Sequence, residues 1–260
     1  MTNPKPITLR LDRLLANLGY GSRREMPPMA RDGRIRLDGE ILLDIEQRVP
    51  LTAEFAARLN VDGAVIDPLP GVVIMLNKPV GVTCSHKENT PLVYDLLPER
   101  WRRRDPAISA AGRLDKETAG LLLLTDDGAF LHRIISPRQH IAKRYVATLD
   151  RPLQGDEANI FAAGTLMLHG EEKPLLPAIL ESISPLEAAV TLTEGRYHQV
   201  RRMFAAVKNH VTALRRVAIG GLTLPDDLKP GAFRVLDPLQ RAMILSSPCA
   251  VNTDVIVPAQ

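Results

Sequence analysis

A stretch rich in glycine and proline divides this chain into two parts. It reads DGAVIDPLPG at residues 62–71, with two glycines and two prolines. Proline removes a backbone donor and glycine permits turns, so such a stretch interrupts helices and strands. We therefore predict a small module at residues 9–60, a linker at 61–71, a larger domain at 72–245 and a tail at 246–260.

The N-terminal module combines helical and strand patterns. Four leucines follow the i, i+3, i+4, i+7 spacing of a helix, namely Leu11, Leu14, Leu15 and Leu18. Gly19 and Gly21 should end this helix, and Ser22 should cap the next one. The alternation of polar and apolar residues from Arg34 onward, which ends in an Asp-Gly pair, predicts a short strand and a turn.

This module is locally basic. Residues 1–36 hold eight Lys or Arg against three Asp or Glu, although the net charge of the whole chain is only +3. The pattern leaves two interpretations open, an ordinary solvated face or a surface that binds nucleic-acid phosphates. Under the second interpretation, the RNA-binding residues of the module are Arg10, Arg13, Arg23, Arg24 and Arg34.

Residues 72–245 mix apolar strand patterns and helical patterns in an irregular order. Strand-like runs such as VVIMLNKP, LLLLT and YVATL do not alternate regularly with the helical segments. Regular alternation is typical of a doubly wound parallel sheet. The irregular order therefore favours an α+β fold with a mixed, largely antiparallel sheet.

One acid of this domain stands in unusual surroundings. Asp115 follows an Arg-Leu step and precedes a strand pattern of four leucines, in AAGRLDKETAGLLLLTDDG. Gly112 and Gly120 lie on either side, which indicates a tight turn or a close approach of the backbone. Asp115 is then either a turn-capping residue or a nucleophile or general base on a rigid support.

A basic helix is predicted near residue 200. Its buried face consists of apolar residues at helical spacing, namely Val200, Met203, Phe204 and Val207. The segment from Gly195 to Val217 has six Lys or Arg and no acid, which a merely soluble helix does not explain. At about 100° per residue, Arg201 flanks the buried stripe and should reach an internal acid. Arg202 points nearly the opposite way and is a further RNA-binding candidate.

Three further stretches allow more than one interpretation. Tyr145 shares a strand face with Lys143 and is either core or a ring on which a base stacks, worth about 1–3 kcal/mol. Lys78 ends a strand and is either a substrate-binding residue that faces an anion or a solvated turn residue. The stretch RWRRR, at residues 100–104, contains the only tryptophan. It is interpreted as a surface loop, with a contact to RNA as the alternative.

Other features bear on the class of protein. Uninterrupted apolar runs stay below the roughly 18 residues that span a membrane, and the N-terminus lacks the apolar region of a secretory signal. Two cysteines, Cys84 and Cys249, make no disulfide framework, and the histidines are few and scattered. We expect a reduced, cytoplasmic protein with no membrane segment and no metal site.

Four motifs in order resemble the pseudouridine synthase family of ribosomal small subunit pseudouridine synthase A. They are LNKPVG from residue 76, GRLDKETAGLLLLTDDG from 112, KRY from 143 and EGRYHQVRRMFAAVKNHV from 194. The N-terminal module is similar to the S-four-like RNA-binding domain of ribosomal proteins that this family often carries. The resemblance covers nearly all of residues 9–240, and four motifs in the right order make it specific.

The resemblance implies a role for each matching residue. Asp115 matches the catalytic aspartate, Arg201 the basic residue that pairs with it, and Tyr145 the tyrosine that packs on the target base. Leu214 matches an apolar residue that lines the pocket, and Arg113 matches an arginine that helps to flip the uridine out.

The implied reaction is the isomerisation of one uridine to pseudouridine by an aspartate, with no cofactor. The RYHQV and FAAVKNHV stretches are closer to the small-subunit enzyme, which implies 16S rRNA and its uridine 516 as the target. The implied partner is 16S rRNA or a small-subunit assembly intermediate, bound by a monomer. Two alternatives stay open, a pseudouridine synthase acting on 23S rRNA and a non-catalytic rRNA-binding assembly factor.

One departure from the family pattern lies in the second helix of the module. Pro27 and Pro28 follow SRREM, where helix formers are expected. A proline inside a helix costs about 3 kcal/mol, whereas a proline in the first turn costs little. The helix is therefore short or kinked, unless the prolines occupy its first turn.

Overall fold

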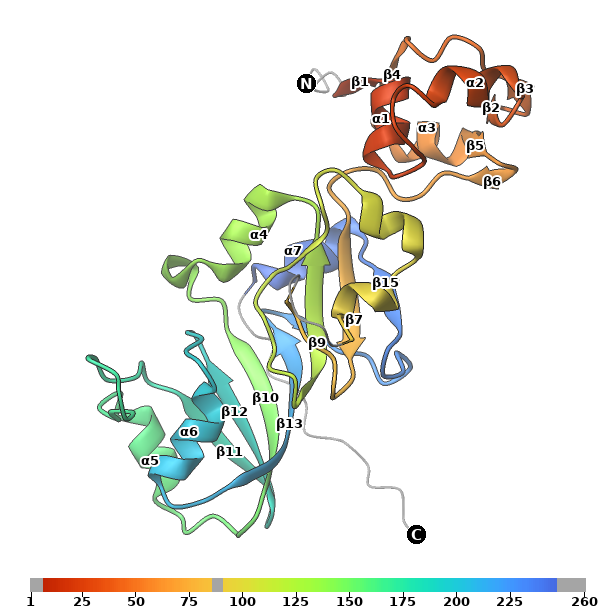
Figure 1. Cartoon of the computed structure of the whole chain (residues 1–260). Helices are drawn as coiled ribbons and strands as arrows, with labels where there is room; N and C mark the ends of the chain where they lie inside the picture. The colour runs from red at the N-terminus through yellow and green to blue at the C-terminus, as the bar shows by residue number, and fades with distance from the viewer. Residues whose placement is uncertain (1–6, 86–90, 247–260) are drawn as a thin grey trace. The chain divides into compact units, whose positions relative to one another are not determined.

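A computed structural model describes residues 7–85 and 91–246, which form two compact units (Figure 1). The first unit consists of the described residues up to Val73, with Tyr94–Ser109 and Leu124–Gly128. The second consists of the described residues of Ile74–Val93, with Ala110–Leu123 and the chain from Ala129 to residue 246. Residues 247–260 of the predicted tail, Cys249 among them, lie outside the described residues.

The first unit contains short helices and two small sheets. Its helices are α1 (Leu11–Asn17), α2 (Met26–Arg31) and α3 (Ala53–Arg58). One sheet pairs β1 (Thr8–Arg10) with β4 (Arg48–Pro50), and the other has the order β3 (Glu40–Ile41), β2 (Ile35–Leu37), β5 (Leu59–Val61), β6 (Ala64–Val65). The helix predicted from leucine spacing is confirmed, because four core side chains are fully buried, namely Leu11, Leu14, Leu15 and Leu18.

The second helix begins later than its sequence indicates. Ser22 does not cap it; its backbone N–H instead donates to Glu25 Oε2 at 2.6 Å, and Glu25 occupies the N-cap position. Pro27 and Pro28 therefore lie in the first turn of α2, where their missing N–H groups would have no helical partner. The prolines shift the start of the helix and do not kink it.

The first half of the predicted linker belongs to the core of this unit. β6 pairs with β5, and the buried residue Ile66 donates its N–H to the oxygen of Leu59 at 3.1 Å. The hairpin turns at Asp62 and Gly63, whose φ angles are +54° and +80°. An Asp-Gly pair with both φ angles positive builds a tight hairpin. The composition that indicated an interruption here builds a turn between paired strands.

The RWRRR stretch forms the 3-10 helix η2 (Glu99–Arg103), which follows η1 (Val93–Leu96), and it is not a surface loop. Trp101 is buried, and Arg100 Nε donates to Asp67 Oδ2 at 2.5 Å. Arg104 pairs with Asp126 at 2.8 Å, and both of these side chains are almost completely buried. These cations are engaged within the unit, so the stretch loses its support as an RNA contact.

The described part of the second unit is built on a nine-stranded sheet, most of whose pairs are antiparallel. The strand order is β11 (Ile179–Ser184), β12 (Glu187–Leu192), β10 (Lys143–Leu149), β13 (Val211–Ile219), β9 (Thr118–Thr125), β7 (Val73–Lys78), β15 (Phe233–Val235). Two further strands pair at the side, β14 (Leu222–Thr223) with β13 and β8 (Ser109–Ala110) with β9. β13 and β9 run parallel, so the sheet is mixed and the predicted α+β class is confirmed.

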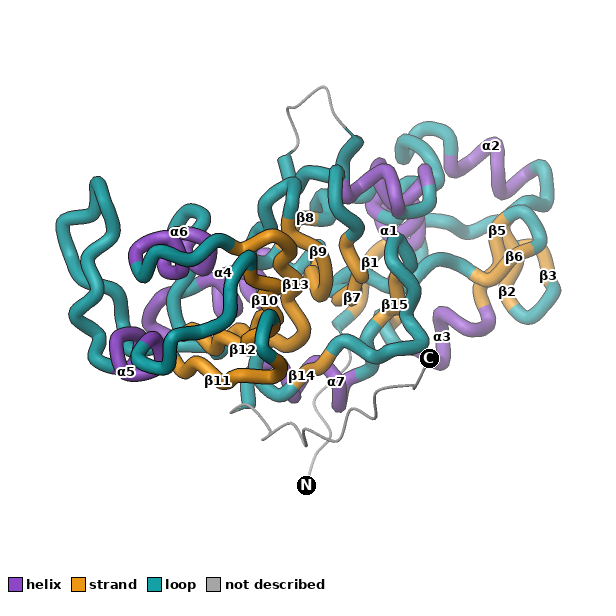
Figure 2. The backbone as a smooth tube through the Cα atoms, turned by 90° about the horizontal axis from the view of Figure 1, so that it is seen from below, coloured by secondary structure: helices purple, strands orange, loops and turns teal. Residues whose placement is uncertain are grey.

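Helices α5 (Glu157–Ala162) and α6 (Gln199–Ala206) lie at the end of the sheet formed by β11, β12 and β10 (Figures 1 and 2). The predicted stripe of α6 packs into the core there, with Val200, Met203 and Phe204 buried and Val207 partly buried. The remaining helical segments are α4 (Gly128–Ile135), the 3-10 helix η3 (Pro137–Gln139) and α7 (Pro238–Ile244). Across the two described ranges, no helix combines the length and apolarity that crossing a membrane requires.

Candidate active site

Asp115 lies in a tight turn between β8 and β9. The N–H of Thr118 donates to the backbone oxygen of Asp115 at 3.0 Å, and Gly112 has a φ of +84°, a left-handed conformation that favours glycine. The Asp115 side chain is 36% exposed. In residues 7–85 and 91–246, no backbone N–H donates to its carboxylate, which removes the support for a turn-capping role. The turn therefore exposes the carboxylate of Asp115 and does not use it as an acceptor for its own backbone.

Lys78 holds this turn from inside the fold. Its side chain is 0% exposed, and its Nζ donates to the backbone oxygens of Pro79 at 3.0 Å, Lys116 at 3.2 Å and Thr118 at 2.8 Å. Burial lowers the pKa of the Lys78 ammonium. Because three carbonyls occupy the three donors of this group, the structure gives no support to the predicted substrate-binding role of Lys78. Lys78 is a structural support of the Asp115 turn.

Arg216 supports the same turn, and sequence reasoning missed it. The residue is 1% exposed, and its guanidinium donates from Nε to the oxygen of Leu121 at 2.8 Å and from Nη2 to that of Gly112 at 3.1 Å. Its guanidinium carbon lies 6.0 Å from the ring centroid of Tyr145. The available signal was its position two residues after Leu214, which places both side chains on one strand face.

The parallel pairing of β13 with β9 explains why residue 120 is glycine. Gly120 lies opposite Arg216 in the register and has a φ of +102°. A Cβ atom there would lie 2.2 Å from the backbone oxygen of Arg216 and 2.8 Å from its nitrogen. The expected close approach of the backbone is therefore real, and it brings the buried guanidinium of Arg216 next to the Asp115 turn.

Lys143 adds a third cation to this region. Its Nζ donates to the oxygen of Ile141 at 3.0 Å. Burial, together with the nearby charge of Arg216, lowers the pKa of Lys143 to about 8. Within the described residues, none of the three cations Lys78, Lys143 and Arg216 has an ion pair with a carboxylate. The interior around the Asp115 turn is therefore positively charged.

His198 is the side chain that contacts the Asp115 carboxylate. Its Nε2 lies 3.4 Å from Asp115 Oδ1, and the imidazole is 38% exposed. The residue precedes α6 and has a φ of +50°, a left-handed conformation that is uncommon outside glycine. The RYHQV stretch of the sequence indicated only the choice of rRNA and not this contact. The RYHQV motif was the signal available for this contact.

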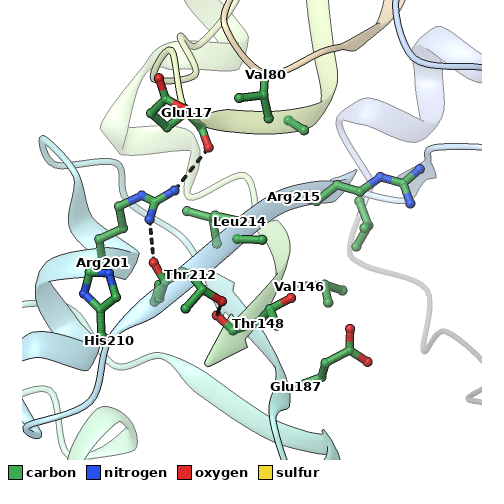
Figure 3. A pocket seen from close by; sticks show the side chains of 14 residues that line it. Val80, Glu117, Val146, Thr148, Glu187, Arg201, His210, Thr212, Leu214 and Arg215 are labelled. Carbon is green, nitrogen blue, oxygen red and sulfur yellow. Dashed lines mark hydrogen bonds between the residues drawn. The ribbon is translucent and has the colours of Figure 1, made fainter. Parts of the chain in front are cut away.

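Arg201 does not pair with Asp115, contrary to expectation. Its Nη1 donates to the oxygen of Val211 at 2.7 Å, and its Nη2 donates to the oxygen of Glu117 at 3.1 Å (Figure 3). The predicted direction was right, because the side chain reaches the segment that holds Asp115. The guanidinium is satisfied there by backbone oxygens, so it ties α6 to β13 and to the Asp115 turn.

A groove of about 590 Å³ lies beside Arg201 and Glu117, and Asp115 and Tyr145 are not among the residues that line it (Figure 3). Leu214, Arg201, Glu117, Thr148 and His210 are among the side chains that line it. Tyr145 lies on β10 directly opposite Arg216 and packs at the edge of the neighbouring core. Arg113 is exposed and has no ion pair within the described ranges.

The predicted RNA-binding arginines fall into two groups. Arg10 and Arg23 both pair with the buried Asp12, at 3.0 and 2.8 Å, and Arg34 pairs with Asp62 at 2.6 Å. Arg202 is held by Glu171 Oε1 at 2.8 Å and by the oxygen of His169, so it does not simply face solvent as expected. Two of the arginines are exposed and have no ion pair within the part of the chain that the structure describes, namely Arg13 and Arg24.

Acids outside the basic segment explain the difference for Arg202. The segment from Gly195 to Val217 has no acid of its own. Glu171, which precedes it by many residues, nevertheless binds both Arg196 and Arg202. Local composition does not show such pairing.

The described ranges contain no group of three or more His, Cys, Asp or Glu that could hold a metal ion.

Comparisons with known proteins agree with this architecture. The family model for RNA pseudouridylate synthase matches residues 72–206, and the S4 domain model matches residues 9–54. Ribosomal small subunit pseudouridine synthase A of Escherichia coli (strain K12) is 43% identical over 232 residues, which is 88% of this chain and 96% of that protein. The uncharacterized RNA pseudouridine synthase YtzG of Bacillus subtilis (strain 168) is 37% identical over 232 residues, 88% of this chain and 95% of that protein.

A solved structure adds to these matches. A crystal structure described as a pseudouridylate synthase superimposes with a TM-score of 0.64 at 34% identity, over 91% of this chain and 99% of that one. The sequence matches and this structural match cover both the small N-terminal module and the larger domain. The chain therefore belongs to the RNA pseudouridylate synthase family and carries an S4 domain before its synthase domain.

Proposed function

We propose that this chain isomerises one uridine of 16S rRNA to pseudouridine and that Asp115 is its catalytic residue. The relatives named as small-subunit enzymes support the choice of RNA, since the Escherichia coli protein matches over nearly its full length. The observation that carries the chemical proposal is the Asp115 carboxylate itself. It is partly exposed on a turn that the buried residues Lys78 and Arg216 fix from behind.

The proposed reaction breaks the bond between N1 of uracil and C1′ of ribose, and it forms a bond between C5 and C1′. The proton lost from C5 balances the proton gained at N1, so nothing enters or leaves overall. Asp115 acts either as the nucleophile or as the base that removes the C5 proton.

Other residues are proposed to hold the flipped nucleoside. Tyr145 offers its ring to the target base, and stacking of this kind contributes about 1–3 kcal/mol. Leu214, two residues before Arg216 on β13, is proposed to offer an apolar contact to the nucleoside, and Arg201 keeps the Asp115 turn and α6 together. Arg113, which is exposed two residues before Asp115, is placed to take part in flipping the uridine.

The S4 domain is proposed to bind the RNA through phosphate contacts, chiefly by the exposed Arg13 and Arg24. The substrate is then 16S rRNA or a small-subunit assembly intermediate, and uridine 516 is the proposed position. A monomer acting in the cytoplasm, with no cofactor, completes the proposal.

A pseudouridine map of both ribosomal RNAs tests this function. A strain lacking the gene should lose one pseudouridine of 16S rRNA, and the wild-type gene should restore it. The gene for Asp115→Asn should not restore the modification although the protein binds RNA. Loss of a 23S rRNA modification would establish the large-subunit alternative. Unchanged maps, with defective subunit assembly, would establish a non-catalytic assembly factor.

A further inference from the structure

Tyr197 and His198 form a stacked aromatic pair beside Asp115. Their ring centroids lie 3.9 Å apart, and the ring planes differ by 16°. The imidazole uses its edge for Asp115, with Nε2 at 3.4 Å from Oδ1, and its face for the tyrosine ring. Tyr197 is 75% exposed, so the outer face of its ring is open to solvent.

The surrounding residues hold this pair in place. A left-handed conformation such as that of His198 costs about 1–3 kcal/mol and persists where neighbouring contacts determine it. Arg196 supplies such contacts, since it binds Glu171 Oε2 at 3.1 Å, Glu194 Oε2 at 3.2 Å and the oxygen of Lys173 at 2.7 Å. The Gln199 side chain accepts from the Arg196 N–H at 2.8 Å and donates to Glu194 at 2.8 Å.

This arrangement is that of a binding surface and not of a core contact. A ring that is three-quarters exposed contributes little to packing, yet two flanking residues anchor its backbone on both sides. An aromatic ring with one face covered and one face open is a preformed platform for a nucleobase. The Asp115 turn also carries two exposed cations, Arg113 and Lys116. Neither has an ion pair in the described ranges. They match the charge of an RNA backbone.

We propose that the Tyr197–His198 pair is a second base-stacking site, which binds a nucleotide that neighbours the target uridine. This inference rests on the proposed function, because it assigns the RNA substrate a contact next to Asp115. The target base itself is assigned to Tyr145. The open face of Tyr197 is the face turned away from His198, so the proposed neighbouring nucleotide and the target base use different rings. Stacking there would fix the register of the strand relative to Asp115.

A cycle that combines protein and RNA changes tests the site. Short RNA fragments that contain the target would carry an abasic nucleotide at each of the three positions on either side of the uridine, one at a time. Single-turnover rates of pseudouridine formation would be measured with wild-type protein, Tyr197→Ala and Tyr197→Phe. The matched control is Leu239→Ala, since Leu239 on α7 is 79% exposed and has no part in the proposed site.

Removal of the ring should lower kcat/KM about 5- to 100-fold on intact RNA. At one position, the abasic nucleotide should cause a similar loss with wild-type protein and almost none with Tyr197→Ala. Tyr197→Phe and Leu239→Ala should behave as wild type at that position. In another outcome, wild-type protein forms product while the loss caused by Tyr197→Ala and the loss caused by the abasic nucleotide multiply at every RNA position. That result refutes the stacking site and leaves the proposed function standing. If wild-type protein forms no product on any target-containing RNA, the proposed function fails first and the stacking site fails with it.

Discussion

The ammonium of Lys78 donates to the backbone oxygen of Thr118 at 2.8 Å, three residues after Asp115. A buried cation that is satisfied only by carbonyls is an unusual device, because burial without a carboxylate is costly. Its three bonds span Pro79, Lys116 and Thr118, so they join the end of β7 to the turn that carries the acid.

Replacement of Lys78 by methionine should destabilise the second unit. The change removes three hydrogen bonds, of which only the oxygen of Lys116 is known to keep another donor, the N–H of Gly81 at 2.9 Å, and it should lower the free energy of unfolding by roughly 2–4 kcal/mol. Urea denaturation measures the change. Lys229→Met is the matched control, since Lys229 is exposed, and it should shift the midpoint very little. Equal stability of the two variants would mean that Lys78 does not support the turn.

Replacement of Asp115 by asparagine should remove pseudouridine formation without unfolding the protein. The side chain is partly exposed, and its one polar side-chain contact among the described residues is to His198, so the free energy of unfolding should change by less than about 1 kcal/mol. RNA binding measured by fluorescence anisotropy should stay within about threefold of wild type. Turnover at the wild-type rate would refute the catalytic assignment.

Two glycines of the same segment should respond differently to alanine. Gly120→Ala places a Cβ 2.2 Å from the backbone oxygen of Arg216, so β9 and β13 must separate. Gly112 also has positive φ, but a Cβ there meets no atom within 4 Å. Gly112→Ala should therefore cost only backbone strain, about 1–2 kcal/mol, and Gly120→Ala clearly more. Thermal unfolding of both variants gives the comparison, and a smaller loss for Gly120→Ala would contradict it.

Stability should depend on the ionisation of Lys143. The pKa of this group is about 8 in the folded chain, below its ordinary value of 10.5. Between these values the unfolded chain binds more protons, so the contribution of Lys143 to stability rises with pH across that window. Below pH 8 the full penalty of burying the charge is present.

A methionine at this position isolates that effect. Lys143→Met should be more stable than wild type at pH 7, by about 2 kcal/mol once the lost bond to Ile141 is subtracted. The advantage should shrink as pH rises from 8 to 10. Urea denaturation of both proteins at each pH measures the difference, and curves that stay parallel would show that Lys143 titrates normally.

The S4 domain should use its unpaired arginines more than its paired ones. Arg13→Gln and Arg24→Gln should each weaken RNA binding uniformly and reduce the salt dependence of log K by about one phosphate contact. Arg10→Gln should instead destabilise the domain, because Asp12 is buried and uses Arg10 and Arg23 as partners. Binding titrations at several salt concentrations, with unfolding curves for each variant, separate the two effects. Equal salt slopes for Arg13→Gln and wild type would remove Arg13 from the interface.

Patterns along the chain were enough to predict the buried helix faces, the class of sheet and the turn around Asp115. The leucines of α1 and the apolar stripe of α6 follow helical spacing. Apolar side chains at this spacing form one face of a helix, and that face packs against the core. The irregular order of strands and helices indicated a mixed sheet, which the parallel β9–β13 pair confirms. The glycines around Asp115 also indicated correctly where the backbone turns and where it passes close to another strand.

Partners that lie far apart in the sequence were beyond those patterns. Arg202 meets Glu171, and Arg201 meets the carbonyl of Glu117, and no local periodicity connects these positions. Lys78 was interpreted as a substrate-binding or solvated turn residue because a lysine before a proline at the end of a strand pattern gives no sign that it is fully buried. His198, which contacts Asp115, has a left-handed backbone, a conformation that patterns of polar and apolar residues do not indicate.

The parallel pairing of β13 with β9 has a consequence for synthesis of the chain. Arg216 on β13 donates to the carbonyl of Leu121, 95 residues earlier. Gly120 pairs with Arg216 on the same strand. A nascent chain that stops short of β13 already holds the aspartate but not the scaffold that orients it. The turn that carries Asp115 therefore gains this support only after the ribosome has added about 100 further residues.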